Sequence, residues 1–459
     1  MLRKLSTYAL TAIFITAIFA VGIAATVNYY YFITHPTYLR ILHVNSSQLA
    51  SEVTNDFKAW YQERYGRPIE VTLTLTDPQT AFQKVAPPSP YAEPEAEIWW
   101  GGPLSLFEKA RDRLLPYNST NKNEINATCY FCPLMDSNQS TPTWYAASVY
   151  GLGVMYNEYA LSLGGLPTPQ SWTDLLKKEY EGNISMVEPT KSESTLPFIT
   201  LIIQNRMSTD DGVQNWTNGW EFLTRLSAFV KEYDDSETYS ALKVAAGYMP
   251  LAVLPDFYAY DKMETYNRVN FTYLDAAVLQ PDPVAIIKRG TYLNEAKAFI
   301  DYLLTERAQS IIGKYRLPIR RDATVSSPRI NPFASNFPRV QGYNATFQEI
   351  GKEIVEDYYQ AWITENHDLI KTAWKEIREA NETLALNPNV NATYYYRLAW
   401  NNFTYAGYNM SRAEVDTIYG ETEGWTQNQA SYIQEWSSTS TQAYSNAAKN
   451  AIKSKEATQ

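Results

Sequence analysis

The residues that could do chemistry in this chain are few, and their types favour binding over catalysis. Only three histidines occur, His35, His43 and His367, spread from one end of the sequence to the other. Imidazole catalysis and a histidine-rich metal site are therefore poorly supported, and no cofactor is predicted. None of the patterns G-x-S-x-G, H-E-x-x-H or P-loop is present. We do not expect an enzyme, although a membrane-anchored extracellular hydrolase and a glycosylated adhesion protein stay open as alternatives.

The two cysteines form a single Cys-x-x-Cys pair, Cys129 and Cys132, within the polar stretch 117–143. Inside a cell this spacing is typical of redox chemistry or of half a zinc site. No second pair follows, and the motif lies in a loop rich in Asn, Ser and Pro rather than at the start of a helix. We therefore predict a small structural disulfide formed in an oxidising compartment.

Polar and aromatic residues follow two predicted strands near the start of the chain. The apolar runs 38–44 and 96–100 are typical of buried strands, while residues 47–65 place apolar side chains on one helical face. Residues 69–75 alternate as a strand does. Alternating strands and helices predict a parallel or mixed sheet, whose ligands bind beyond the carboxyl ends of its strands. The candidate binding residues at these ends are Ser46, Ser47, Trp99, Trp100 and Gly101.

A second unit follows, because 459 residues are too many for one hydrophobic core. A helix is also predicted over 295–315, in which Thr305 could cap an internal start, and the chain from about 343 is expected to be helical. The sequence further predicts extended chain over 144–157, a helix over 172–180, a strand over 183–187, a helix over 196–204 and a strand over 285–288.

The first residues predict export. Residues 5–27 carry no charge, and as a helix they would span roughly 34 Å, against about 30 Å for the hydrocarbon core of a bilayer. Arg3 and Lys4 would stay in the cytoplasm, with the main domain outside the cell on a single-pass membrane anchor. The alternative is a secretory signal cut near residues 22–24. Both readings place the body of the protein outside the cell.

Charge and sequons agree with that location. The formal net charge is −10 and no basic run occurs, which argues against nucleic acid as a partner. Some Asn-x-Ser/Thr sequons arise by chance in a chain rich in Asn, but the rest predict a glycoprotein from an archaeal or other glycosylating host. The sequons lie at Asn45, Asn118, Asn126, Asn138, Asn183, Asn215, Asn270, Asn344, Asn381, Asn391, Asn402 and Asn409.

Three blocks of sequence carry a family resemblance. They are WYAASVYGLGVMYN at 144–157, LPTPQSWTDLLKKEYEGNISMVEPTKSEST at 166–195 and VAIIKRGTYLNEAKAFIDYLLTERAQSII at 284–312. In this order they resemble extracellular solute-binding proteins of ABC importers, most closely the group of ferric-iron, polyamine and small-anion receptors. The resemblance implies an α/β protein of the type II periplasmic-binding-protein fold, with two α/β lobes joined by hinge strands. Such a receptor closes on a small solute, alters none of its bonds and delivers it to a membrane permease.

Under this resemblance the chain divides into five parts. They are an N-terminal anchor or signal (1–33), the first part of lobe 1 (38–143), lobe 2 (144–272), the return of lobe 1 (273–330) and a C-terminal helical extension (331–459). The extension has the weakest match, and its role stays open.

The resemblance also implies binding residues in lobe 2. In the family, a Ser-Gly-Thr turn before a helix commonly holds an anionic group on hydroxyls and backbone amides. This sequence has Ser192, Glu193, Ser194 and Thr195 there. Because a carboxylate repels anions unless it is paired, for example with Lys191, a polyol, a cation or a metal would suit the turn better. Alternatively, Glu193 faces solvent and Ser194 only caps the helix.

Ferric receptors of the family use adjacent tyrosines, whose counterpart here is Asp256 with Tyr258 and Tyr260. On a strand the two tyrosines would face one side, and on a helix they would diverge. Aromatic residues such as Tyr145 and Trp100 could instead stack on a sugar, enclose a cation or pack in the core. The solute therefore stays open among a sugar or polyol, a polyamine, a small anion and a metal ion. We expect Trp100→Ala to weaken binding far more than folding.

Overall fold

The structure covers most of the chain. The computed structural model describes residues 34–89, 94–138, 140–192, 195–206, 216–275, 277–340, 352–405 and 429–458, with isolated positions from 14 to 30. Within this part of the chain, no helix combines the length and apolar character that crossing a membrane requires. Most of the segment 5–27 lies outside the described residues, so the anchor and the cleaved signal both stay predictions.

The chain forms two compact units. Unit 1 comprises residues 1–127, 133–148 and 281–326, and unit 2 comprises residues 128–132, 149–280 and 327–459. The main passages between them therefore fall at 148/149 and 280/281. The sequence placed these passages near 144 and 273. It also set residues 331–459 apart, whereas they cluster here with unit 2.

Unit 1 is built on a mixed sheet. In spatial order its strands are β2 (Ile69–Leu75), β1 (Thr37–His43), β3 (Ile98–Trp100) and β11 (Val278–Ile286), of which β11 begins in unit 2. The first three strands are parallel, and β11 runs antiparallel to β3. Every residue of β3 and β11 is buried, because helices cover both faces of such a sheet.

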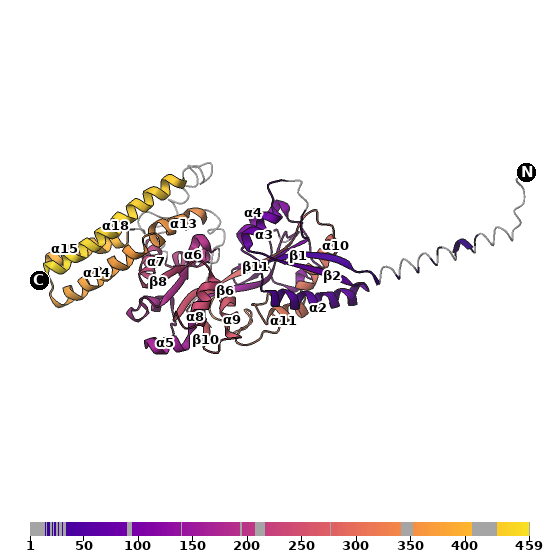
Figure 1. The fold of residues 1–459 in the computed structure, drawn as a ribbon, viewed down its shortest axis with the longest axis horizontal. Helices are drawn as coiled ribbons and strands as arrows, with labels where there is room; N and C mark the ends of the chain where they lie inside the picture. The colour runs from indigo at the N-terminus through magenta and orange to yellow at the C-terminus, as the bar shows by residue number, and fades with distance from the viewer. Residues whose placement is uncertain are drawn as a thin grey trace, which may run out of the picture. The chain divides into compact units, whose positions relative to one another are not determined.

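Side-chain caps fix where the helices of unit 1 begin. The Oγ of Ser46 accepts a hydrogen bond from the Leu49 amide, and this sets the start of the first long helix. Thr305 caps another helix in the same way, so the helix expected over 295–315 is two helices. The helices are α2 (Ser47–Tyr65), α3 (Pro78–Val85), α4 (Leu104–Lys109), α10 (Leu293–Leu303) and α11 (Glu306–Ile312) (Figure 1).

Unit 2 has a sheet and helices of its own. In spatial order its strands are β6 (Tyr145–Asn157), β9 (Leu251–Pro255), β7 (Ile184–Val187) and β8 (Val230–Asp234), with β10 (Val269–Thr272) also paired to β6. Strand β7 is parallel to β8 and β9, whereas β9 and β10 are antiparallel to β6. The helices are α5 (Glu158–Gly164), α6 (Thr195–Arg206), α7 (Thr217–Phe229), α8 (Glu237–Ala245) and α9 (Asp256–Met263).

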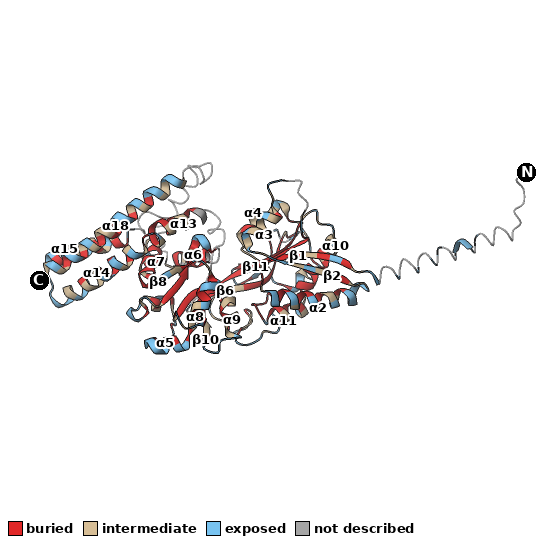
Figure 2. Ribbon diagram, in the orientation of Figure 1, coloured by how far each residue is buried: buried red, intermediate tan, exposed pale blue. Residues whose placement is uncertain are grey.

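The C-terminal helices extend the core of unit 2. They are α13 (Lys352–Tyr359), the π-helical turn η7 (Gln360–Thr364), α14 (His367–Leu386), α15 (Val390–Phe403) and α18 (Gln429–Ala457). Helices α14, α15 and α18 lie side by side, each with a buried stripe (Figure 2). The ring of Trp220 on α7 lies 5.0 Å from Tyr358, and Phe229 lies 5.9 Å from Trp374. The extension therefore shares one hydrophobic core with the sheet's own helices.

The cysteine pair lies on a short hairpin and corrects one prediction. Cys129 belongs to β4 (Thr128–Cys129) and Cys132 to β5 (Cys132–Pro133), with Tyr130 between them at a φ of 55°. The structure does not join the two by a disulfide, and both side chains are buried. Burial raises the pKa of the Cys132 thiol well above its usual value, which favours the protonated thiol. The pair acts here as small apolar side chains inside the protein.

Candidate functional site

The carboxyl edge of the unit 1 sheet carries one carboxylate in a close-fitting setting. Strands β1 and β3 are parallel and end at His43 and Trp100. Because Val284 pairs with Trp100 in the antiparallel strand, Asp282 lies just beyond the end of β3, opposite Gly102. Its Oδ1 accepts a hydrogen bond from the Gly102 amide at 3.1 Å. Its Oδ2 accepts one from the Ser148 hydroxyl at 3.2 Å.

Burial shapes the chemistry of this carboxylate. Asp282 is buried, and burial raises its pKa above the usual value, while the nearby charge of Arg316 acts against that rise. Sequence reasoning missed Asp282. A signal was present, because Asp282 is the single charged residue of an otherwise uncharged run, residues 276–287. A charge inside a buried strand is uncommon unless it has a partner or a function.

Glycine is required beside this carboxylate. Gly101 has a φ of 92°, and a Cβ there would lie 2.8 Å from the Asn45 Nδ2 and 3.1 Å from the Asp282 Oδ1. The glycine therefore lets the backbone approach both side chains closely. The predicted position of Gly101 at this edge agrees with the structure. Ser46 is also at the edge, where it caps α2, and Ser47 is the exposed first residue of that helix.

Asn45 was predicted as a glycosylation site, and the structure corrects this. Its side chain is 4% exposed, and its amide donates to the Trp100 carbonyl at 3.5 Å. A glycan needs a solvent-exposed amide, so this sequon is one of those that arise by chance. Other predicted sequons lie at exposed residues, among them Asn118, Asn126, Asn138, Asn381 and Asn391. Asn215, Asn344 and Asn409 lie outside the described residues.

The two tryptophans are core residues, which overturns their predicted role in binding. Trp99 stacks on Phe107 at 3.8 Å with an interplanar angle of 14°. Trp100 is 1% exposed and meets Phe299 of α10 edge-on at 5.7 Å. A parallel strand covered on both faces buries both of its alternating sides, so neither ring faces solvent.

Tyr145 is likewise held by its own unit. Its hydroxyl donates to the Tyr117 carbonyl at 2.9 Å and accepts from the Ser119 amide at 3.1 Å. The ring is buried, and burial raises the pKa of Tyr145 to about 12. These bonds commit the hydroxyl to packing within unit 1, so Tyr145 is not placed as a binding residue.

The carboxyl edge of the unit 2 sheet also carries a buried carboxylate. Strands β7 and β9 are parallel and end at Val187 and Pro255, and Asp256 follows directly as the first residue of α9. Asp256 is 1% exposed. Its Oδ2 accepts hydrogen bonds from the Gly151 amide and the Tyr273 hydroxyl, both at 2.7 Å. The sequence identified Asp256 but not the two donors, which come from distant strands.

Tyr258 and Tyr260 lie on helix α9 and therefore diverge. Tyr260 is buried, and its hydroxyl lies 3.1 Å from that of Tyr273, whereas Tyr258 is half-buried against Phe257. Burial raises the pKa of Tyr260, which disfavours the phenolate that ferric iron prefers. Among the residues that the structure describes, no cluster of His, Cys, Asp and Glu could hold a metal ion.

The hydroxyl turn before α6 is only partly described, since Glu193 and Ser194 lie outside the described residues. Ser192 is buried, and its hydroxyl donates to the carboxylate of Glu237. The same Oγ accepts from the amide of Thr195, the first residue of α6, at 3.3 Å. Lys191 contacts Glu188 at 3.2 Å. The turn is therefore bound to the protein's own acids at its described residues.

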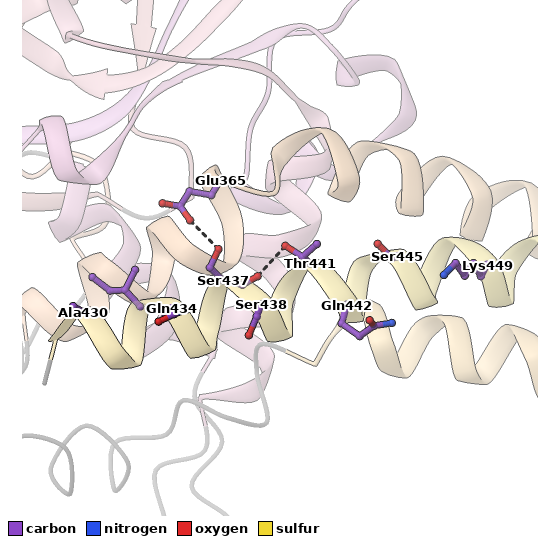
Figure 3. Close-up of a pocket in the computed structure, with 10 residues that line it drawn as sticks. Glu365, Ala430, Gln434, Ser437, Ser438, Thr441, Gln442, Ser445 and Lys449 are labelled. Atoms are coloured by element: carbon purple, nitrogen blue, oxygen red, sulfur yellow. Dashed lines mark hydrogen bonds between the residues drawn. The ribbon is translucent and has the colours of Figure 1, made fainter.

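Two hollows in the described part of unit 2 lie away from these edges. One, of about 880 Å³, runs along the polar face of α18, where Ser437 donates to Glu365 at 3.3 Å (Figure 3). The other, of about 560 Å³, lies between Tyr233 and His367. Neither is lined by any of the predicted binding residues.

Comparisons with known proteins agree with this architecture. The family described as bacterial extracellular solute-binding protein matches residues 106–335, which is half of the chain. The phosphoglycerate transport regulatory protein PgtC of Salmonella typhimurium is 26% identical over 253 residues, or 53% of this chain. The chain spans only 59% of the length of that relative.

Two solved structures share the fold. The periplasmic binding protein P5PA superposes with a TM-score of 0.56 at 21% identity, covering 71% of this chain and 99% of that one. The periplasmic binding protein AfuA from Actinobacillus pleuropneumoniae, solved with fructose-6-phosphate, gives a TM-score of 0.57 at 18% identity, covering 72% and 99%. At these identities the likeness concerns the fold alone, and it confirms the predicted mixed α/β architecture.

Proposed function

The chain belongs to the bacterial extracellular solute-binding protein family, and from this we propose that it is the receptor of an ABC importer. In this role it captures a small solute outside the cell and delivers it, chemically unchanged, to a membrane permease. Solutes in open α/β sheets bind beyond the carboxyl ends of the strands. The two edges described above are therefore the proposed binding surfaces.

One observation carries this proposal. Ser148 and Gly151 lie three residues apart on β6, the strand along which the chain passes from unit 1 to unit 2. Ser148 donates to Asp282 at the edge of unit 1, and Gly151 donates to Asp256 at the edge of unit 2. The same short stretch of strand is thus bonded to the buried carboxylate of each edge. A solute that contacts both carboxylates would act directly on this stretch, as a closing receptor requires.

The proposed location is the outer side of the cell membrane. It rests on the uncharged segment 5–27 and on exposed sequons such as Asn118, Asn126 and Asn381. The segment serves either as an anchor or as a cleaved signal. An N-terminal sequence of the protein from its native membrane decides between these two, because only an anchor leaves residue 1 or 2 at the terminus.

The receptor proposal is tested by calorimetry on the purified full chain. The names of the relatives supply the first compounds to titrate, 3-phosphoglycerate and fructose 6-phosphate, with fructose and spermidine as uncharged and cationic alternatives. A receptor binds one solute at one molecule per chain and releases it intact. Chemical turnover of that solute would reject the proposal in favour of the hydrolase alternative.

A further inference from the structure

The donors that could hold an anion at the edge of unit 1 are already occupied by the protein itself. Gly101 and Gly102 have φ angles of 92° and 119°, which turn the backbone toward the edge. In many proteins such a turn holds a phosphate on its amides. Here the Gly102 amide and the Ser148 hydroxyl both donate to the carboxylate of Asp282. An incoming anion would have to displace this carboxylate or lie beside it.

The edge of unit 2 repeats this arrangement with different residues. The Gly151 amide and the Tyr273 hydroxyl donate to Asp256. At the turn before α6, the Ser192 hydroxyl donates to Glu237. Each of these donors would suit a bound anion, and each faces an internal carboxylate instead.

The cations near these edges are also matched by acids. Arg316 is buried close enough to Asp282 for its charge to act on that carboxyl group. Arg329, beneath the ring of Tyr260, has Glu264 at 3.5 Å. Lys191 contacts both Glu188 and Asp235. The formal net charge of the chain, −10, adds no attraction for an anion.

A buried carboxylate gains from further donors. Burial raises the pKa of Asp282, which means that its charged form is poorly solvated in place. A hydroxyl or ammonium group from a ligand would stabilise that charge, whereas a phosphate beside it would be repelled. The preference should be larger than at an exposed carboxylate, because the surroundings screen charge less.

We propose that the solute is held by donor groups of its own, hydroxyls or amines, that face the carboxylates Asp282 and Asp256, and that an anionic group does not anchor it. This rests on the proposed function and deepens it. The receptor would then accept a polyhydroxylated or amine-bearing small molecule. It would differ in this respect from PgtC, whose name refers to phosphoglycerate, and from AfuA, which was solved with fructose-6-phosphate.

Inorganic phosphate is the probe that tests this without knowledge of the solute. Thermal unfolding of the full chain is measured in rising sodium phosphate against sodium chloride of equal ionic strength. We expect no saturable rise in Tm for the parent protein. Asp282→Ala frees the Gly102 amide and the Ser148 hydroxyl, so this variant should gain a saturable rise. Asp112→Ala, which removes an exposed carboxylate elsewhere in unit 1, is the control and should behave like the parent.

A saturable rise in the parent at millimolar phosphate would overturn the inference, whether or not Asp282→Ala folds. Calorimetry with fructose, fructose 6-phosphate and spermidine then separates the two donor chemistries. Fructose binding at least as tightly as its phosphate ester supports a hydroxylated solute, and tighter spermidine binding supports an amine. Fructose 6-phosphate binding tenfold more tightly than fructose contradicts the inference while leaving the receptor function intact. Turnover of a solute would instead defeat the receptor function itself.

Discussion

The two carboxyl edges use the same device with different firmness. In unit 2, Asp256 accepts two bonds of 2.7 Å, and the network continues through Tyr273 to Tyr260. In unit 1, Asp282 accepts bonds of 3.1 and 3.2 Å from Gly102 and Ser148. Shorter bonds that form part of a buried network contribute more to stability. The difference indicates that Asp256 mainly holds unit 2 together, while Asp282 is the carboxylate more available to a ligand.

The largest effect should come from the core behind the edge of unit 1. Trp100→Ala should lower the free energy of unfolding by about 3–5 kcal/mol, because it leaves a cavity against Phe299. This reverses the expectation from the sequence, in which binding suffered more than folding. Urea unfolding measures the first quantity, and calorimetry of the folded variant measures the second. A variant of parental stability that has lost affinity would restore Trp100 to the binding surface.

Removal of each edge carboxylate sharpens the comparison directly. Asp256→Ala leaves the Gly151 amide and the Tyr273 hydroxyl buried without an acceptor, so we expect a loss of roughly 2–4 kcal/mol in stability. Asp282→Ala should cost about 1–2 kcal/mol, because its bonds are longer. Denaturant unfolding of both variants, with Asp112→Ala as reference, gives the order. The comparison fails if Asp282→Ala is the more destabilised protein.

Glycine variants separate backbone strain from the close approach at Gly101. Gly66 and Gly101 both have positive φ, at 64° and 92°, but only Gly101 has side chains within reach of an added Cβ. Gly66→Ala should therefore cost about 1 kcal/mol, and Gly101→Ala roughly 2–3 kcal/mol, since Asn45 must also move. Thermal and urea unfolding measure both. Equal losses would show that the approach of Asn45 and Asp282 to Gly101 adds nothing.

The smallest effect concerns alkaline pH and should appear in both units. Burial raises the pKa of Tyr145 in unit 1 to about 12, and it raises the pKa of Tyr233 in unit 2 to about 12. An unfolded tyrosine loses its proton near pH 10, as ordinary tyrosines do. The stability that these groups contribute is therefore complete below about pH 10 and is lost as the pH rises toward 12.

Unfolding in urea between pH 8 and pH 11.5 measures this loss. Tyr145→Phe and Tyr233→Phe should each make the decline with pH shallower than in the parent protein. Stability that stays constant from pH 9 to pH 11 would contradict the burial of these hydroxyls. A decline that only Tyr233→Phe reduces would assign the alkaline sensitivity to unit 2 alone.

The local pattern of the sequence predicted much of the fold. The strand expected over 69–75 and the helix over 47–65 are β2 and α2 with the same bounds, and Thr305 caps a helix as proposed. These features depend on residues close together in the chain, such as a cap and the amide three positions on. The resemblance in three blocks added the family, which residue spacing alone did not provide.

The site was less predictable, because it depends on pairing between distant strands. Asp282 reaches the edge only through the register of β11 against β3, and Gly151 meets Asp256 only through β6 and β9. The direction of Trp100 was also hidden, since both faces of its strand are buried. Periodicity cannot tell a core face from a binding face in such a strand.

The receptor account is tested most directly by native mass spectrometry of the full chain purified without added ligand, followed by calorimetry with whatever small molecule it carries. The account predicts one molecule per chain, recovered unchanged after incubation, which carries hydroxyl or amine groups and binds at least tenfold more weakly to Asp282→Ala. A molecule that the protein converts to a product, or one that binds Asp282→Ala and the parent equally well, would contradict it.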